Sequence, residues 1–160
     1  NIIQAIRIEQ LDNESREKNI LLMGVISPPE SLDLAAKKDQ DWRNIDKIFE
    51  KCDLNPNMIK RWTRFKKTHN SPHEPIIKVE LYHRDDVYVT LRASRKLKDS
   101  TGKSNIFINP DLTPAQRHAE KTLITKRNEL NKKLPSNSTT YYGIRNGVIK
   151  SITKPIQHPN

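Results

Sequence analysis

The order of β-prone and amphipathic segments over residues 19–112 constrains the fold of this chain most. Apolar or alternating runs predict four strands, at 19–26, 58–67, 76–82 and 106–108. Between them, apolar residues at helical spacing predict two amphipathic helices, at 39–52 and 84–98. The resulting order, βαββαβ, is that of ferredoxin-like α+β folds, which the RNA-recognition motif (RRM) shares. We therefore expect a ferredoxin-like, RRM-like domain over residues 19–112.

The four predicted strands differ in pattern. The run 19–26 is continuously apolar, which predicts a strand buried on both faces. Residues 58–67 alternate in polarity, which predicts a strand at or near a sheet edge. Two roles stay open for Trp62: it covers the sheet, or it provides a platform on which a base stacks. Asn109 and Pro110 are expected to end the last strand.

The two predicted helices have apolar stripes and acidic starts. Asp39 or Asp41 favours the start of the first helix, after a mobile connection over 28–40. Asp85 and Asp86 are expected to cap the second helix. The stripe of the first helix consists of Trp42, Ile45, Phe49 and Cys52, and that of the second of Val87, Leu91, Ser94 and Leu97.

Residues 113–152 predict a long helix followed by a small hairpin. Thr113 is suited to cap the helix, and Pro114 then takes the first helical position, where its missing N–H costs nothing. Asn146-Gly147 predicts a type I′ turn between two strands. Residues 153–160 are expected to form a flexible tail. The expected buried side of the helix consists of Ala115, Ala119, Leu123, Leu130 and Leu134.

Residues 1–18 predict a helix with Ile2, Ile6 and Leu11 near one stripe. Two interpretations stay open: the end of a coiled coil through which the chain self-associates, or a helix packed on its own domain or frayed. The chain lacks an initiator Met and a signal peptide, so we expect it to be a piece of a longer protein.

The charge of the chain favours a nucleic-acid partner. The net charge is +10, and the isoelectric point is near 9.8. A single cysteine, Cys52, indicates a reducing compartment, so we expect a cytoplasmic or nuclear location. No apolar run is long enough to span a membrane, and no metal-binding, cofactor-binding or catalytic motif is evident. We therefore expect a protein that is not an enzyme and needs no metal or cofactor.

Six segments resemble, in the same order, parts of a known family, the first-open-reading-frame proteins of LINE-type non-LTR retrotransposons. The segments are SREKNILLMGV, IKRWTRFKK, EPIIKVEL, VTLRASRKLK, IFINPDLTPAQR and YYGIRNGVIKSI. In that family an Arg precedes an Asn-apolar-apolar-apolar-Gly strand, and a strand ending in Asp-Leu-Thr leads into a helix. Two residues depart from the family pattern: Glu74 stands where the family usually has Arg, and Lys66 where it usually has Gly.

The resemblance implies single-stranded RNA binding and nucleic-acid chaperoning in a ribonucleoprotein, usually as a coiled-coil trimer that coats the RNA of the element. A host protein recruited from such an element would share the fold, so the fold alone does not define the function.

The basic residues suggest where RNA would bind. The central predicted strands carry no aromatic residues, so we expect phosphate contacts rather than base stacking on the sheet. We expect clusters on strand 58–67, at the end of helix 84–98 and on helix 113–134 to line a groove between the RRM-like domain and the C-terminal segment. The alternative is a protein-interaction module that binds RNA only weakly. The candidate residues are Lys60, Arg61, Arg64, Lys66, Lys67, Arg92, Arg95, Lys96, Lys98, Lys103, Arg117, Lys121, Arg127, Tyr141, Tyr142, Arg145 and Lys150.

Overall fold

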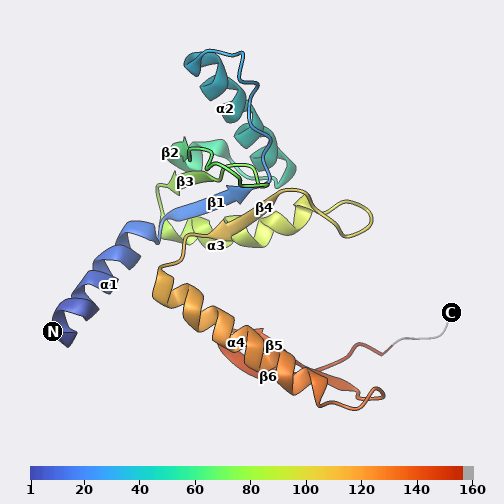
Figure 1. Cartoon of the computed structure of the whole chain (residues 1–160). Helices are drawn as coiled ribbons and strands as arrows, with labels where there is room; N and C mark the ends of the chain where they lie inside the picture. Colours follow the sequence, from blue (N-terminus) through green and yellow to red (C-terminus); the bar gives the residue numbers. More distant parts are fainter. Residues whose placement is uncertain (157–160) are drawn as a thin grey trace. The chain divides into compact units, whose positions relative to one another are not determined.

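The chain is an α+β protein with two antiparallel sheets (Figure 1). The computed structural model describes residues 1–156. These residues belong to two compact units, Asn1–Asp111 (unit 1) and the chain from Leu112 onward (unit 2), and each unit is described by itself.

Unit 1 is built on a four-stranded sheet in the order β2-β3-β1-β4. Every neighbouring pair is antiparallel, and β1 and β2 lie on either side of β3. The prediction that the second strand lies at an edge is confirmed. The strands are β1 (Asn19–Met23), β2 (Ile59–Arg64), β3 (Ile77–Leu81) and β4 (Phe107–Pro110).

Two helices cover one face of this sheet, which we call the core face. They are α2 (Leu34–Lys51) and α3 (Arg84–Ala93). The short 3₁₀ helix η1 (Pro56–Met58) directly precedes β2, and a second one, η2 (Ser94–Leu97), extends α3. Ile20 pairs with Val79 across β1 and β3, so both project to the same face. The resulting core also contains Leu22, Ile77, Leu81, Ile108, Ile45, Phe49, Cys52, Val87 and Leu97. The predicted stripes of both helices thus provide most of the helical core, with Trp42 and Leu91 at its margin.

The opposite face, which we call the open face, carries Leu21 and Met23 of β1. Both are only partly buried, so the prediction that the first strand is buried on both faces is wrong. The reason is that α2 and α3 both pack on the core face. The strand is also shorter than predicted. It ends before Gly24, whose φ is +82° and whose Cα approaches the Asn105 carbonyl so closely that an added Cβ would lie 2.0 Å from that oxygen.

The start of α2 and the cap of α3 differ from the predictions, whereas α3 begins at Arg84 as predicted. Helix α2 begins at Leu34, because Asp33 caps it by accepting a 2.8 Å hydrogen bond from the Ala36 N–H. Much of the predicted connection over 28–40 is therefore helical. Helix α3 has His83 at its N-cap, without a side-chain cap hydrogen bond. Asp85 and Asp86 lie within its first turn instead, where a negative charge still complements the helix dipole.

The prediction that Asn109 and Pro110 end the fourth strand is wrong. Asn109 and Pro110 belong to β4, where Pro110 pairs with Ile20. A proline is tolerated there because β4 is an edge strand, and its missing N–H can face away from the sheet.

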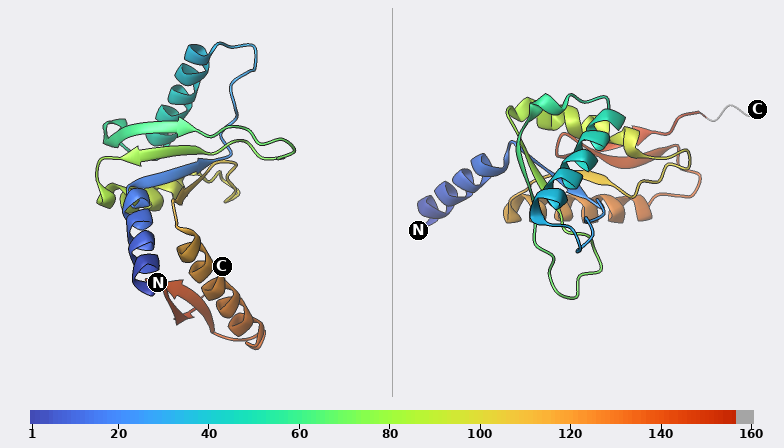
Figure 2. Two further views of the ribbon diagram at one scale, coloured as in Figure 1. Left: turned by 60° about the vertical axis from the view of Figure 1, so that its left-hand side comes forward. Right: turned by 90° about the horizontal axis from the view of Figure 1, so that it is seen from above.

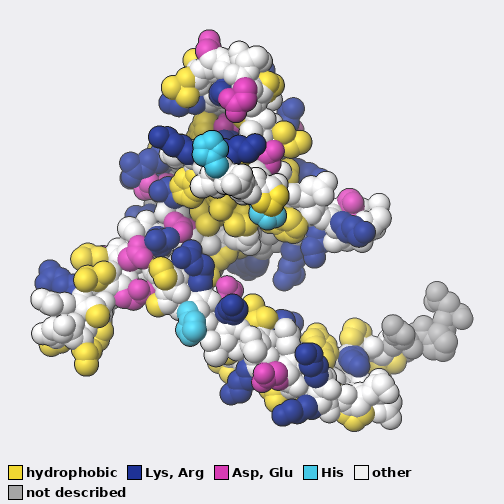
Figure 3. All heavy atoms as spheres, viewed as in Figure 1, with side chains coloured by type: hydrophobic (Ala, Val, Ile, Leu, Met, Phe, Trp, Pro, Cys, Tyr) yellow, Lys and Arg dark blue, Asp and Glu magenta, His cyan; other side chains and the backbone are white. Residues whose placement is uncertain are grey.

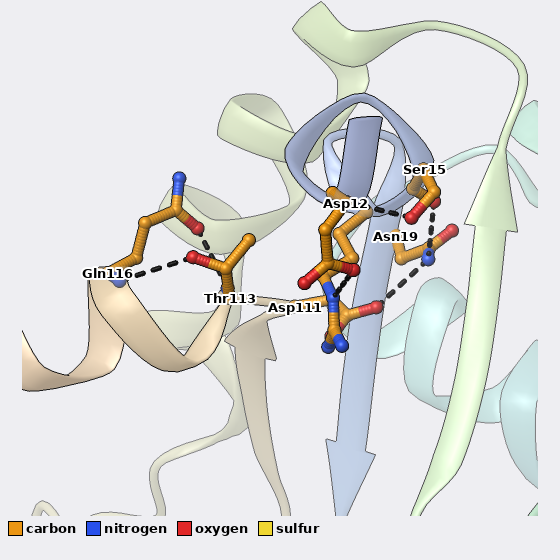
Figure 4. Close-up of polar contacts among 7 residues, drawn as sticks. Asp12, Ser15, Asn19, Asp111, Thr113 and Gln116 are labelled. Carbon is orange, nitrogen blue, oxygen red and sulfur yellow. Dashed lines mark hydrogen bonds and ion pairs between the residues drawn. The ribbon is translucent and has the colours of Figure 1, made fainter. Parts of the chain in front are cut away.

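Helix α1 (Ile2–Arg16) joins β1 and β4 through a polar cluster at its C-terminal end (Figure 4). Arg16 donates to Asp12 at 2.7 Å and to Asp111 at 3.0 Å. The Asn19 side chain donates to the other Asp111 oxygen at 2.9 Å and to the Ser15 carbonyl at 3.2 Å. None of the residues of α1 is buried.

Unit 2 consists of α4 (Pro114–Lys132) and a hairpin of β5 (Thr140–Arg145) and β6 (Val148–Thr153) that lies along it (Figures 1 and 2). The predicted cap is present: the Gln116 N–H donates to the Thr113 hydroxyl at 3.2 Å. The Gln116 side chain completes a capping box by accepting from the Thr113 N–H at 2.9 Å (Figure 4). The type I′ turn is confirmed by positive φ values at Asn146 and Gly147.

The buried side of α4 is shorter than predicted. Leu123, Leu130 and Leu134 are partly buried, whereas Ala115 and Ala119 are exposed. The partly buried stripe therefore begins after the first two turns of the helix, in which the two alanines lie. Of the expected tail, Thr153 belongs to β6, and the part over 157–160 lies outside the described residues. No helix within 1–156 has the length and apolar character needed to cross a membrane.

Candidate nucleic-acid interface

Four cations of the first predicted cluster lie exposed along the free edge of β2 and the residues that follow it: Lys60, Arg61, Lys66 and Lys67. They line one side of a groove of about 1110 Å³, whose other side is the start of α2 and the loop before it. Arg61 pairs with Glu80 on the neighbouring strand, and the Lys60 ammonium lies 3.5 Å from the same carboxylate. The hydrogen bond from Arg61 holds the pKa of Glu80 below its usual value.

Arg64, the fifth member of this cluster, lies inside the fold. Its guanidinium binds both oxygens of Asp41 on α2, with distances of 2.9 and 2.8 Å. It also donates to the carbonyls of Val25 at 3.0 Å and Pro75 at 2.9 Å. The side chains of Arg64 and Asp41 are only 12% and 6% exposed. Arg64 therefore joins α2, the loop after β1 and the segment before β3.

The second cluster is divided by the structure. Arg95, Lys98 and Lys103 line a cavity of about 590 Å³ beside β4. Asp99 orders the loop that carries Lys103, because its carboxylate accepts from the Thr101 hydroxyl at 2.6 Å and from the Lys103 N–H at 3.0 Å. These hydrogen bonds lower the pKa of Asp99. Arg92 is exposed on α3 and does not line this cavity, and Lys96 pairs with Asp53 at 2.7 Å.

On α4 of unit 2, Arg117 and Lys121 are exposed and one helical turn apart, so a phosphate chain can follow both. Arg127 lies on the partly buried stripe with Leu123 and Leu130, and its guanidinium donates to the Asn128 side chain at 2.8 Å.

The hairpin separates the two candidate tyrosines. Alternation along β5 places Tyr141 and Arg145 on one face, together with Lys150 of β6, and Tyr142 on the other. Both tyrosines are partly buried. The backbone of Tyr142 is bound by the Asn131 side chain, which accepts from its N–H at 2.7 Å and donates to its carbonyl at 2.9 Å.

Phe65 and Phe107, which the sequence did not predict as site residues, are exposed aromatic residues beside the basic clusters. Phe65 is 44% exposed and Phe107 is 53% exposed. Phe107 pairs with Met23 of β1 and therefore lies on the open face, whereas its neighbour Ile108 is buried in the core. Alternation along residues 106–108 places Phe107 and Ile108 on opposite faces of the strand, which is the sequence signal for an exposed Phe107.

Glu74, where the chain departs from the family pattern, has a local structural partner. Its carboxylate accepts hydrogen bonds from the Ser27 N–H at 3.0 Å and the Ser27 hydroxyl at 2.5 Å. These bonds, with smaller contributions from Lys67 and Arg64, lower the pKa of Glu74. The carboxylate therefore ties the loop after β1 to the segment before β3.

No protein-family model matches the chain, and no curated protein matches it significantly.

Proposed function

We propose that this chain binds single-stranded RNA in a ribonucleoprotein of the LINE-retrotransposon type, without catalysing a reaction. Contacts between phosphates and exposed Lys and Arg side chains provide most of the affinity. One observation carries the proposal: cations line grooves along both edges of the unit 1 sheet, Lys66 and Lys67 beside β2 and Lys98 and Lys103 beside β4. Figure 3 shows Lys and Arg side chains around the hydrophobic side chains on one face of unit 1.

The proposed fold of unit 1 is ferredoxin-like, of the RRM-like kind. The sequence of elements from β1 to β4 supports this proposal, as does the position of β3 between β1 and β2. Ordinary RRMs stack bases on aromatic residues of the two central strands. Here Leu21 and Lys78 occupy paired positions at the centre of the open face, which supports a binding mode led by phosphate contacts.

The proposed assembly is a coiled coil formed by α1. Its isoleucines are strongly exposed, with 79% at Ile2, 74% at Ile3 and 68% at Ile8. Large apolar side chains on a surface helix favour burial against another chain. Several RNA-binding units held together in this way would also suit the chaperone activity that the resemblance implies.

The binding test uses a labelled single-stranded RNA of about 30 nucleotides, titrated over a series of salt concentrations. We expect the log–log plot of affinity against salt to have a slope of about −0.7 for each phosphate contact. The variant Lys66→Ala/Lys67→Ala and the variant Arg117→Ala/Lys121→Ala should each bind more weakly and flatten this slope. The control Lys132→Ala/Lys133→Ala removes the same charge at the end of α4. Negligible binding of the unmodified chain at low salt would contradict the proposal.

A second candidate function is a protein-interaction module in a ribonucleoprotein. The exposed apolar surface of α1 favours it, because such a surface can also receive a different protein. Salt distinguishes the two functions, since an apolar interface depends on salt far less than phosphate contacts do.

A further inference from the structure

The open face of unit 1 carries an aromatic surface at one end of the sheet. Phe107 of β4 lies beside Met23, whose sulfur lies 3.0 Å from the Asn109 side chain on the same face. Phe65 follows β2 directly, and its N–H donates to the Ile76 carbonyl at 2.9 Å, which continues the pairing of β2 with β3. Alternation after Arg64, which projects to the core face, places Phe65 on the open face.

These residues line one hollow. Met23, Phe65, Ile76 and Phe107 contribute to a cavity of about 680 Å³, with Lys66 and Lys67 at its side. The two phenylalanines come from opposite edges of the sheet, three inter-strand spacings or about 14 Å apart. The cavity has the size of a small-ligand site, which typically measures about 300–1,000 Å³.

The hollow adjoins both cation-lined grooves within unit 1. Phe65 lines the groove of Lys60 and Arg61 as well as the hollow. Phe107 lines the hollow as well as the cavity of Lys98 and Lys103. The arrangement is therefore cations, an aromatic ring, a hollow, a second aromatic ring, and cations again.

From this arrangement we infer that Phe65 and Phe107 stack bases of a single RNA strand that crosses the end of the sheet, while the lysines of the two grooves bind its phosphates. The inference rests on the proposed function and adds a base-contacting site to it. Aromatic rings accept any base, so the site binds single strands with little sequence preference. Glu74, the carboxylate in the hollow, is held by Ser27.

An extended peptide added as a strand suits this surface less well. The pairing of β2 with β3 shifts register between Ile59 and Arg61, which is typical of a bulge, and the edge carries Lys60 and Arg61. The other edge, β4, is only four residues long and ends in Pro110. Charges, bulges, short strands and prolines are the features that prevent strand addition at sheet edges.

The test compares Phe65→Ala, Phe107→Ala and Phe107→Leu with the matched control Tyr88→Ala, which removes an aromatic ring that is 56% exposed on α3. Two probes are used across a salt series: a single-stranded RNA of about 30 nucleotides containing 2-aminopurine, and an abasic strand of the same length. Phe107→Leu keeps the apolar volume and removes the ring, and far-UV circular dichroism verifies the fold of each variant.

We expect each Phe variant to weaken RNA binding by between about fivefold and about a hundredfold, and to leave the salt slope unchanged. The quenching of 2-aminopurine on binding should diminish in the Phe variants, while their binding of the abasic strand and the behaviour of Tyr88→Ala should not change. Phe107→Trp keeps an aromatic ring and should therefore bind RNA as tightly as the unmodified chain does.

Two results would overturn the inference and leave the proposed function intact. One is steep, salt-dependent RNA binding that is equal in the Phe variants and the unmodified chain. The other is quenching of 2-aminopurine that is equal in the Phe variants and the unmodified chain, which would place the bases away from the two rings. Absence of RNA binding by the unmodified chain at low salt would instead contradict the proposed function itself.

Discussion

Arg64 has a structural role in the fold that differs from the RNA-binding role predicted for it from the sequence. In the sequence it belongs to a run of basic residues that favours RNA binding. In the fold its guanidinium is enclosed by Asp41 and by the carbonyls of Val25 and Pro75. A buried arginine needs such partners, because an ion removed from water without them costs several kcal/mol.

We predict that Asp41→Ala destabilises unit 1 by about 3–5 kcal/mol, because it leaves the Arg64 charge buried without its counterion. Urea unfolding followed by tryptophan fluorescence measures the loss. Asp39→Ala is the control: Asp39 pairs with Arg43 on the same helix, but both side chains are more than half exposed. That change should cost less than about 1 kcal/mol. Equal effects of the two substitutions would contradict the structural role of Arg64.

At the scale of elements, polar contacts join segments that lie far apart in the sequence. The segment SREKNILLMGV contributes Arg16 and Asn19, and IFINPDLTPAQR contributes Asp111, which binds both of them. The two segments therefore meet at the C-terminal end of α1. In unit 2, Asn131 of α4 plays a similar part for β5, since its side chain satisfies both backbone groups of Tyr142.

We predict that Asn131→Ala destabilises unit 2 by about 1–3 kcal/mol, because the Tyr142 N–H and carbonyl lose their side-chain partner. Hydrogen exchange of the Tyr142 amide, measured by NMR, should accelerate together with that of its neighbours in β5. Asn128→Ala removes an exposed asparagine from the same helix and should change exchange little. An unchanged exchange rate in Asn131→Ala would show that the contact does not hold the hairpin to α4.

At the scale of the whole molecule, the exposed isoleucines of α1 lie apart in the sequence from the basic residues proposed to bind RNA. Helix α1, which has no buried residue, carries exposed isoleucines, whereas the cations lie on the sheet edges of unit 1, beside the hollow of Phe65 and Phe107, and on unit 2. This distribution fits the proposed self-association through α1 and the proposed binding of RNA by the cations.

We predict that the chain self-associates in a concentration-dependent manner, and that Ile2→Ser/Ile6→Ser makes it monomeric. Burial of isoleucine side chains favours association by about 1.5–3 kcal/mol for each fully buried residue. Sedimentation equilibrium measures the oligomeric state. Val148→Ser is the control, because it removes an apolar side chain that is 54% exposed on the hairpin. A monomeric unmodified chain at high concentration would contradict the proposed coiled coil.

The sequence by itself determined the elements whose signals lie within a few residues of each other. Thr113 and Pro114 predicted the start of α4, Asn146-Gly147 predicted the hairpin turn, and Ile45 and Phe49 predicted the buried side of α2. These features depend on hydrogen bonds and side-chain spacing within one or two turns of the chain, so a local pattern contains them.

Only the tertiary structure decided the features that depend on partners distant in the chain. The partner of Arg64 lies 23 residues away, and that of Asn19 lies 92 residues away. The placement of Phe65 and Phe107 on the open face at one hollow, and the division of the second basic cluster, follow from how β2, β3, β1 and β4 are paired. Strand pairing brings together residues that are distant along the chain, and hydrophobic burial then decides which face of each strand meets solvent.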